Sequence, residues 1–190
     1  MELLSEEEEK IALELTRRAI MSYIEPECEE LELPPIFEEK IGGVIITNSV
    51  QGYPEEWILL ENSVCSLKEG IFEAAKKAYQ DGDVALHIFF PDAHDTNIVR
   101  LEIIIMSVPK ALECRPEERP DNIVIGRDGL AIYVGSDRRG FFFLPQIAIG
   151  KKLGPGEFLE KACEDIGIPL QIPNCDSVKI TTFQVQTITE

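Results

Sequence analysis

The sequence lacks any hydrophobic run long enough to cross a membrane. Its longest apolar stretches are residues 103–106 and, when aromatic residues are counted, residues 141–145. A transmembrane helix needs roughly 20 apolar residues. Residues 1–6 are acidic rather than basic, so neither a secretory signal nor a transit peptide is expected. We therefore predict a cytoplasmic protein with no membrane partner.

The sequence is also poor in positive charge. Its lysines and arginines number 18 against 35 aspartates and glutamates, for a formal net charge of −17. The basic residues form no stretch that would attract a phosphate backbone; they occur as scattered pairs, Arg17-Arg18, Lys76-Lys77, Arg138-Arg139 and Lys151-Lys152. Nucleic-acid binding is therefore not expected. Solubility is the simplest reason for the charge, with a basic protein partner or a saline cytoplasm as alternatives.

Histidine and cysteine, the usual ligands of structural zinc, are few. The chain has 2 histidines, His87 and His94, and 5 cysteines with no Cys-x-x-Cys pair. A structural zinc site needs four ligands in close pairs, and a disulfide framework needs a secretory setting. We therefore predict no metal and no cofactor. The loop of residues 91–95, with His94 between two aspartates, has donors for a divalent cation, but a polar hairpin turn is the simpler explanation.

Two helix starts stand out among the features that are present. Each has a serine followed three residues later by a glutamate, Ser5 with Glu8 and Ser66 with Glu69. In such a capping box, the hydroxyl and the carboxylate accept backbone N–H groups at the start of a helix. Apolar residues at helical spacing follow both pairs. We predict helices over residues 5–24 and 67–80, and a short helix over residues 157–166.

Strands outnumber helices. They are predicted over residues 44–47, 84–90, 98–108, 123–125, 130–134, 141–144 and 178–188, with a tight turn at Arg127-Asp128-Gly129. Because helices come singly and not between every pair of strands, this pattern predicts an α+β fold with mostly antiparallel strands. A Rossmann-like fold is not expected. The sequence also has no P-loop and no Gly-x-Ser-x-Gly elbow.

Several motifs follow one another in the C-terminal half. They are Gly126-Arg127-Asp128-Gly129-Leu130, Arg139-Gly140, Leu144-Pro145-Gln146, and a helix with Phe158-Leu159-Glu160, Cys163 and Gly167. In this order and spacing they resemble the AMMECR domain family. The first helix, residues 43–47 and the helix from Leu67 extend the resemblance over most of the chain. It implies one α+β domain over residues 1–190, with two sheet-and-helix lobes that meet at a cleft and a homodimeric assembly. The lobes are predicted at residues 1–110 and 111–190, or interleaved.

The motifs of this family that suggest chemistry are not retained here. Those motifs are L-R-G-C-I-G and, after a helix, D-P-R-F. Counting back from Leu67 places Trp57 at or near the cysteine of the first, and Asp83 stands at the arginine of the second. A cysteine beside arginines has the lowered pKa of an activated thiolate. The nearest thiol in this chain, Cys65, lies instead in an apolar and acidic stretch.

These observations predict a non-catalytic or accessory protein that binds a small ligand or a protein partner in the cleft between the lobes. No catalytic residue is predicted. The candidate cleft residues are Trp57, which offers an aromatic surface, Asp83, Arg127, Asp128 and Gln146. Two alternatives stay open. One is an enzyme of unknown reaction that works through other residues, such as Cys65, Asp83 and Arg127, and the other is a structural component of a homodimer.

Overall fold

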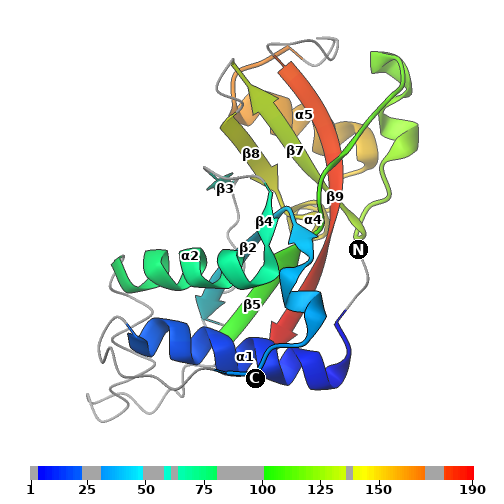
Figure 1. Ribbon diagram of the computed structural model, residues 1–190. Helices are drawn as coiled ribbons and strands as arrows, with labels where there is room; N and C mark the ends of the chain where they lie inside the picture. The colour runs from blue at the N-terminus through cyan, green and yellow to red at the C-terminus, as the bar shows by residue number, and fades with distance from the viewer. Residues whose placement is uncertain are drawn as a thin grey trace, which may run out of the picture. The chain divides into compact units, whose positions relative to one another are not determined.

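The chain divides into two compact units, described here from a computed structural model. Unit 1 comprises Met1–Tyr53, Val64–Met106 and Gln186–Glu190, and unit 2 comprises Pro54–Ser63 and Ser107–Val185. The structure describes residues 4–22, 31–48, 58–60, 64–80, 101–135, 139–169 and 178–190. The predicted strand over residues 84–90 and the loop of residues 91–95 lie outside these ranges. Helices and antiparallel strands are mixed (Figure 1), so the predicted α+β class is confirmed.

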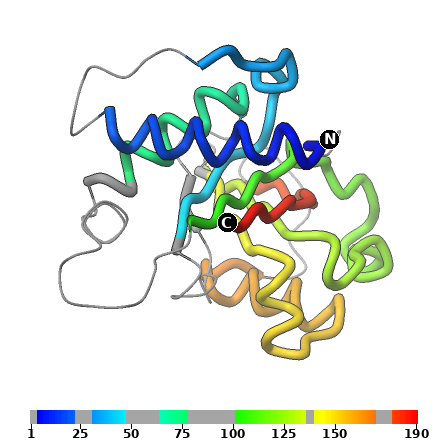
Figure 2. Tube along the Cα trace, turned by 90° about the horizontal axis from the view of Figure 1, so that it is seen from below, coloured from blue at the N-terminus to red at the C-terminus, as the bar shows by residue number. Residues whose placement is uncertain are grey.

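Unit 1 packs two helices against one face of an antiparallel sheet. The helices are α1 (Glu6–Ser22) and α2 (Leu67–Gln80), and they lie alongside each other in both views (Figures 1 and 2). Strand β2 (Gly43–Asn48) pairs with β5 (Leu101–Met106), and the end of β9 (Val178–Thr189) lies next to β5. A short second sheet joins β1 (Lys40–Ile41) to β4 (Cys65–Ser66), after the 3₁₀ helix η1 (Pro35–Glu38).

Both predicted capping boxes form. The N–H of Ser5 donates to the Glu8 carboxylate at 2.9 Å, and the N–H of Glu8 donates to Ser5 Oγ at 3.4 Å. At α2 the corresponding distances between Ser66 and Glu69 are 2.9 Å and 3.2 Å. These bonds satisfy N–H groups that have no partner inside the helix. Residues close in sequence therefore fix where both helices begin.

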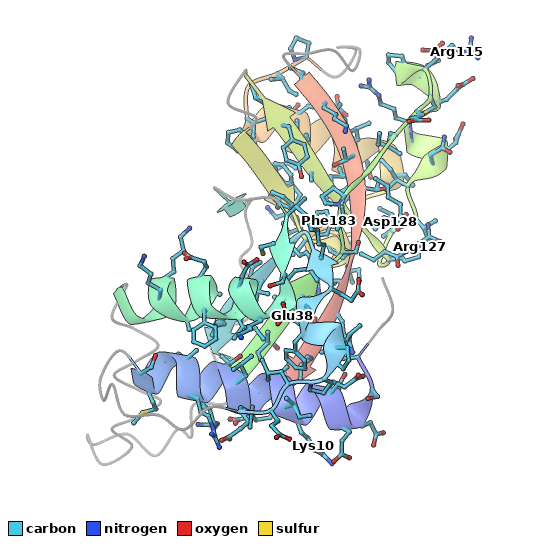
Figure 3. The ribbon with its side chains drawn as sticks, in the orientation of Figure 1. Lys10, Glu38, Arg115, Arg127, Asp128 and Phe183 are labelled. Carbon is cyan, nitrogen blue, oxygen red and sulfur yellow. The ribbon has the colours of Figure 1, made fainter. Side chains whose placement is uncertain are left out.

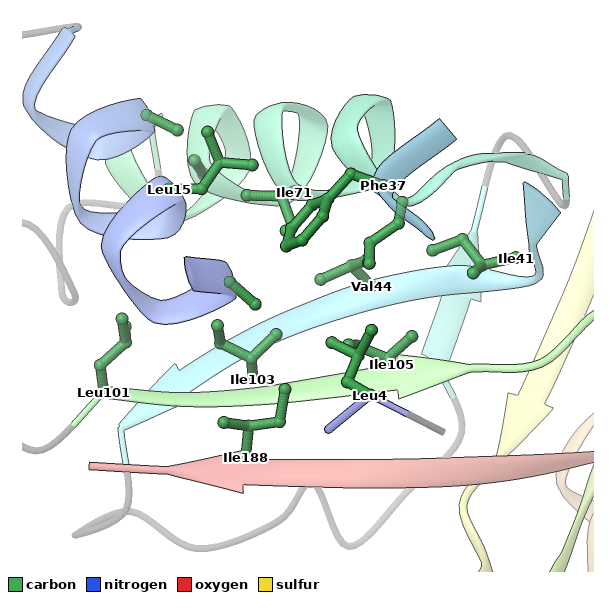
Figure 4. Packing of buried hydrophobic residues seen from close by; sticks show 14 of the residues in the cluster. Leu4, Leu15, Phe37, Ile41, Val44, Ile71, Leu101, Ile103, Ile105 and Ile188 are labelled. Atoms are coloured by element: carbon green, nitrogen blue, oxygen red, sulfur yellow. The ribbon is translucent and has the colours of Figure 1, made fainter. Parts of the chain in front are cut away.

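The core of unit 1 is aliphatic. Every second residue of β5, namely Leu101, Ile103 and Ile105, faces the helices and is buried, as the alternation of a strand requires. Figure 4 shows these side chains together with Ile71 of α2 and Phe37 of η1, which are also buried. Burying each such side chain contributes roughly 1.5–3 kcal/mol. This contact fixes α1 and α2 on the sheet.

Unit 2 is an antiparallel sheet in the order β9-β7-β8-β3 with short helices. The strands are β7 (Asp128–Val134), β8 (Arg139–Phe143), β3 (Ile58–Leu60) and the first part of β9, with β6 (Lys110–Ala111) also paired to β9. The helices are η2 (Pro116–Glu118), η3 (Pro120–Asn122), α4 (Pro145–Gly150) and α5 (Pro155–Asp165). Helix α5 and strand β9 agree with the sequence prediction to within two residues at each end.

Aromatic rings pack on glycines in this sheet. The Phe142 ring lies 5.5 Å from that of Phe183 and 6.0 Å from that of Tyr133, between ring centres. A Cβ on Gly129 would lie 2.5 Å from Phe183 Cζ, which is closer than two carbon atoms can approach. Gly129 therefore gives the Phe183 ring its space.

Two local predictions in this region are wrong. The residues predicted as a strand, 123–125, instead lead into a turn in which Val124 O accepts the N–H groups of Arg127 and Asp128 at 3.2 and 2.9 Å. The turn is centred on Gly126, whose φ of +84° suits glycine. The predicted turn residues Asp128 and Gly129 therefore open strand β7. The apolar run suggested a strand, but Gly126 is the residue that allows the chain to reverse.

Candidate functional site

Unit 1 contains a pocket of ≈ 670 Å³. Its lining is mixed, with more apolar than polar residues: it consists of Leu4, Pro35, Ile36, Ile41, Leu67 and Ile105 with Ser5, Glu8, Glu39 and Lys40. Pockets for small molecules usually measure about 300–1,000 Å³. The volume of this pocket lies within that range.

Backbone hydrogen bonds hold the floor of the pocket in place. The N–H of Leu67 donates to Glu39 O at 3.0 Å, which ties the start of α2 to the segment after η1. Ile41 lies opposite Cys65 in the β1–β4 pair. Ile41, Leu67 and Ile105 are all buried. A floor fixed in this way does not have to be ordered when a ligand enters.

Gln186 of β9 fixes the wall at Leu4. Its Oε1 accepts the Leu4 N–H at 2.9 Å, and its Nε2 donates to Leu4 O at 3.1 Å and to Glu9 Oε1 at 2.8 Å. The sequence analysis missed this residue. The signal was the strand alternation: Ile188 faces the core, so the polar residue two positions earlier lies on the same face.

Charged groups of both signs surround the pocket. Hydrogen bonds from the Ser5 hydroxyl and N–H lower the pKa of Glu8, so this carboxylate is ionised at neutral pH. Glu39 and Lys40 are exposed. Hydrogen bonds from Ser66 lower the pKa of Glu69, and the charge of Lys40 adds to this effect. Among the lining residues that the structure describes, there is no cysteine and no histidine.

Cys65, the candidate thiol, has the wrong environment for a nucleophile. It is half-buried in β4, and burial raises its pKa, with the charges of Glu69 and Glu73 raising it further. In unit 2, burial raises the pKa of Cys163 to about 11, although the charge of the buried Arg119 acts in the opposite direction. An activated thiol needs a lowered pKa.

Arg127 and Asp128 are joined in unit 2 (Figure 3). Arg127 Nε and Nη2 donate to the two carboxylate oxygens of Asp128 at 2.8 Å each, and the N–H of Val124 donates to Oδ2 at 2.9 Å. Burial alone would raise the pKa of Asp128, but the bonds from Arg127, Val124 and Gln184 outweigh it and lower the pKa. The side chain of Asp128 is 5% exposed and that of Arg127 is 57% exposed. Asp128 therefore fixes the turn, while Arg127 presents its remaining donors to solvent.

The other candidate residues do not join this pair in the described structure. Gln146 lies in the first turn of α4, and its Oε1 is buried without a hydrogen-bond partner among the residues described. Trp57 and Asp83 lie outside the described residues. Cys65 belongs to unit 1 and Arg127 to unit 2, and each unit is described by itself.

Two further properties can be stated for the described part of the chain. It contains no group of three or more His, Cys, Asp or Glu side chains placed to hold a metal ion. Within the same residues, no helix is long and apolar enough to cross a membrane.

Comparison with known proteins gives relatives over nearly the whole chain. A family model described as AMMECR1 matches residues 64–188. A protein of Methanocella arvoryzae is 32% identical, with 99% of this chain and 93% of its own covered. A protein of Thermoplasma volcanium is 33% identical, with 91% and 85% covered. The crystal structure of the uncharacterized protein PH0010 from Pyrococcus horikoshii has a TM-score of 0.64 at 24% identity over 97% of this chain and 92% of its own, which shows a shared fold.

Proposed function

The chain belongs to the AMMECR1 family, and we propose that it is a non-catalytic protein that binds an apolar small molecule in the pocket of unit 1. The observation that carries the proposal is the pocket itself, ≈ 670 Å³ with more apolar than polar residues in its lining. The sequence predicts the cleft between the lobes as the site. We propose the pocket instead, because its lining and the bonds that hold it are defined residue by residue.

The lining determines what the ligand must offer. Pro35 and Ile36, which are more exposed than the other apolar residues of the lining, can contact an aliphatic or aromatic group, at about 25 cal/mol for each Å² of apolar surface removed from water. Carboxylates and an ammonium group near the opening can meet a polar end of the ligand. A compact molecule, apolar at one end and polar at the other, therefore fits best.

The pocket is tested with N-phenyl-1-naphthylamine, a neutral fluorophore that brightens in apolar surroundings. We expect saturable binding to the full chain. Ile36→Arg should weaken it about tenfold or more, because the substitution brings a charge into an apolar site. The matched control is Ile149→Arg, which changes an exposed isoleucine of unit 2 and should leave the affinity unchanged. Circular dichroism checks that both variants fold. Equal affinity in the two variants would show that the probe binds elsewhere, and the proposal would be wrong.

The non-catalytic part of the proposal is tested by thiol reactivity. Because burial and nearby glutamates raise the pKa of Cys65, we expect iodoacetamide to alkylate it more slowly at neutral pH than it alkylates free cysteine. Cys163, with a pKa of about 11, should react more slowly still. Mass spectrometry of digested protein gives the rate at each position. A Cys65 that reacts faster than free cysteine would contradict the proposal and support the enzyme alternative.

A further inference from the structure

The pocket of unit 1 offers a ligand few hydrogen-bond donors. Backbone N–H groups along its lining already donate to acceptors within the protein, namely those of Leu4, Ser5, Glu8, Glu39 and Leu67. The Ser5 hydroxyl donates to the Glu8 carboxylate at 2.7 Å. Among the described side chains of the lining, this leaves the ammonium group of Lys40 as a donor. A ligand that accepts hydrogen bonds therefore finds few groups to bind.

The pocket offers more acceptors than donors. Glu8 and Glu39 both line it, and each carboxylate has two oxygens that can accept several hydrogen bonds. The bonds from Ser5 go to Oε2 of Glu8, and Glu39 is exposed. Neither carboxylate forms an ion pair with another described residue. A ligand that donates hydrogen bonds therefore finds acceptors on two elements, the first turn of α1 and the segment between η1 and β1.

Lys40 carries the positive charge of the lining, and a carboxylate outside the lining offsets it. The charge of Lys40 lowers the pKa of Glu69, which caps α2 through Ser66. The lining therefore carries two negative charges against one positive charge that is already offset. Because the chain as a whole has a net charge of −17, its field opposes an anion at this pocket and favours a cation.

We propose that the pocket of unit 1 binds a protonated amine that carries an apolar group. An ammonium group has N–H donors and no acceptor, which matches a lining with carboxylates and few donors. Hydrogen bonds between charged groups are about twice as strong as those between neutral groups. The apolar group of the ligand lies against Pro35 and Ile36. This inference rests on the proposed function and adds the chemical class of the ligand.

Displacement of N-phenyl-1-naphthylamine from the full chain tests the charge of the ligand. The competitors are hexylamine, hexanol and hexanoate, which have equal numbers of carbon atoms and are positive, neutral and negative at neutral pH. We expect hexylamine to displace the probe at about tenfold lower concentration than hexanoate, with hexanol between them. The preference should narrow as salt is added. Calorimetry with each compound alone gives the same comparison without the probe.

Glu39→Gln tests the carboxylate itself, since Glu8 also caps α1. We expect it to weaken the binding of hexylamine about fivefold and to leave that of hexanol unchanged. Glu38→Gln is the matched control, because it removes the same charge from an exposed neighbour outside the described lining. If Glu38→Gln has the same effect, the net charge of the chain and not the pocket selects the amine, and this inference is wrong.

Failure of this inference differs from failure of the proposed function. If Ile36→Arg weakens binding of the probe but the three compounds compete equally, the pocket binds small molecules without selecting an amine. Only this inference is then wrong. If Ile36→Arg leaves the binding of both the probe and hexylamine unchanged, the pocket is not the site, and both proposals are wrong.

Discussion

Unit 1 and unit 2 use acidic side chains differently. In unit 1, Glu8 and Glu69 each cap a helix through a serine three residues away. In unit 2, Asp128 accepts the N–H of Val124 across a turn and also interacts with Gln184 on another strand. The helix starts of unit 1 therefore depend on neighbours in sequence alone, whereas Asp128 adds to its neighbours in sequence a contact with a residue of another strand.

The cores of the two units also differ in the side chains that fill them. Unit 1 packs aliphatic side chains of two helices on β5 and leaves a pocket at one end. Unit 2 packs the Phe183 ring directly on the backbone of Gly129. Aliphatic packing between helices and a sheet adapts to small changes, whereas a ring against a backbone has no room for an added atom. We therefore expect the largest effects of single substitutions in unit 2.

Gly129→Ala should give the largest effect. The added Cβ would lie 2.5 Å from Phe183 Cζ and 2.8 Å from Phe143 O. One of these neighbours is backbone in a paired strand, so it cannot move aside without loss of hydrogen bonds. We expect the free energy of unfolding in urea to fall by about 3 kcal/mol.

Gly150→Ala is the matched control, because a Cβ there meets nothing within 4 Å and the residue lies in a helix. It should leave the stability unchanged or raise it by up to about 1 kcal/mol. If both alanines have the same effect, close packing is not what requires Gly129, and the contrast between the two cores is lost.

Asp128→Ala should cost about 2 kcal/mol, because it leaves the part-buried N–H of Val124 without its side-chain acceptor. Arg127→Ala removes the exposed partner of the same pair and should cost less than Asp128→Ala, because ion pairs at the surface contribute little. The pKa of Asp128 is lower in the folded chain than in the unfolded chain. Its carboxylate therefore contributes fully to the free energy of unfolding above the unfolded pKa of about 3.9, and this contribution is lost as the pH falls towards the pKa of the folded chain. Urea titrations at neutral and acid pH should therefore show the Asp128→Ala difference shrinking in acid. A constant difference would mean that the carboxylate charge is not involved.

The difference between partners that are near in sequence and contacts set by the fold also explains how far the sequence predicts the structure. The capping boxes of α1 and α2 were predictable because their partners lie three residues apart. Arg127 and Val124 are also near Asp128 in sequence, but Asp and Gly favour turns, so the sequence predicts a turn and not a strand at Asp128 and Gly129. The contact of Asp128 with Gln184 depends on the pairing of β7 with β9. The pocket was also hidden, because it combines the chain before α1, η1, β1, α2 and β5, whose proximity only the fold reveals. Trp57 and Asp83 remain predictions from the family resemblance.

Unit 1 also contains a buried acidic side chain, Glu102 of β5. It is 6% exposed, and its Oε1 has no hydrogen-bond partner among the described residues. Burial raises its pKa, against the effect of a hydrogen bond from Thr189. The folded state then keeps a proton that the unfolded state releases above about pH 4.3, so the free energy of unfolding falls as the pH rises from there towards the folded pKa.

Glu102→Gln should remove this pH dependence. We expect the variant to be more stable than the unchanged chain at neutral pH by about 1 kcal/mol, with the advantage disappearing near pH 4. Glu38→Gln, at an exposed position of η1, is the control. It should change neither the stability at neutral pH nor the dependence of the stability on pH. A Glu102→Gln variant that loses stability at neutral pH would show that the ionised carboxylate has a partner, and unit 1 would then resemble unit 2 more closely.

The smallest effect is expected at the end of α4, where unit 2 departs from the pattern of the unit 1 helices. Lys152 has a φ of 55° and Lys151 a φ of −89°. A left-handed conformation costs a residue with a Cβ about 1–2 kcal/mol. Glycine avoids this cost, but it makes the unfolded chain more flexible, which offsets part of the gain in stability. Lys152→Gly should therefore raise the free energy of unfolding by about 0.5 kcal/mol, and Lys151→Gly should lower it by a similar amount. Opposite signs from adjacent lysines exclude a general effect of charge, since both variants lose one positive charge. If both variants lose stability, Lys152 makes a contact that outweighs its strain.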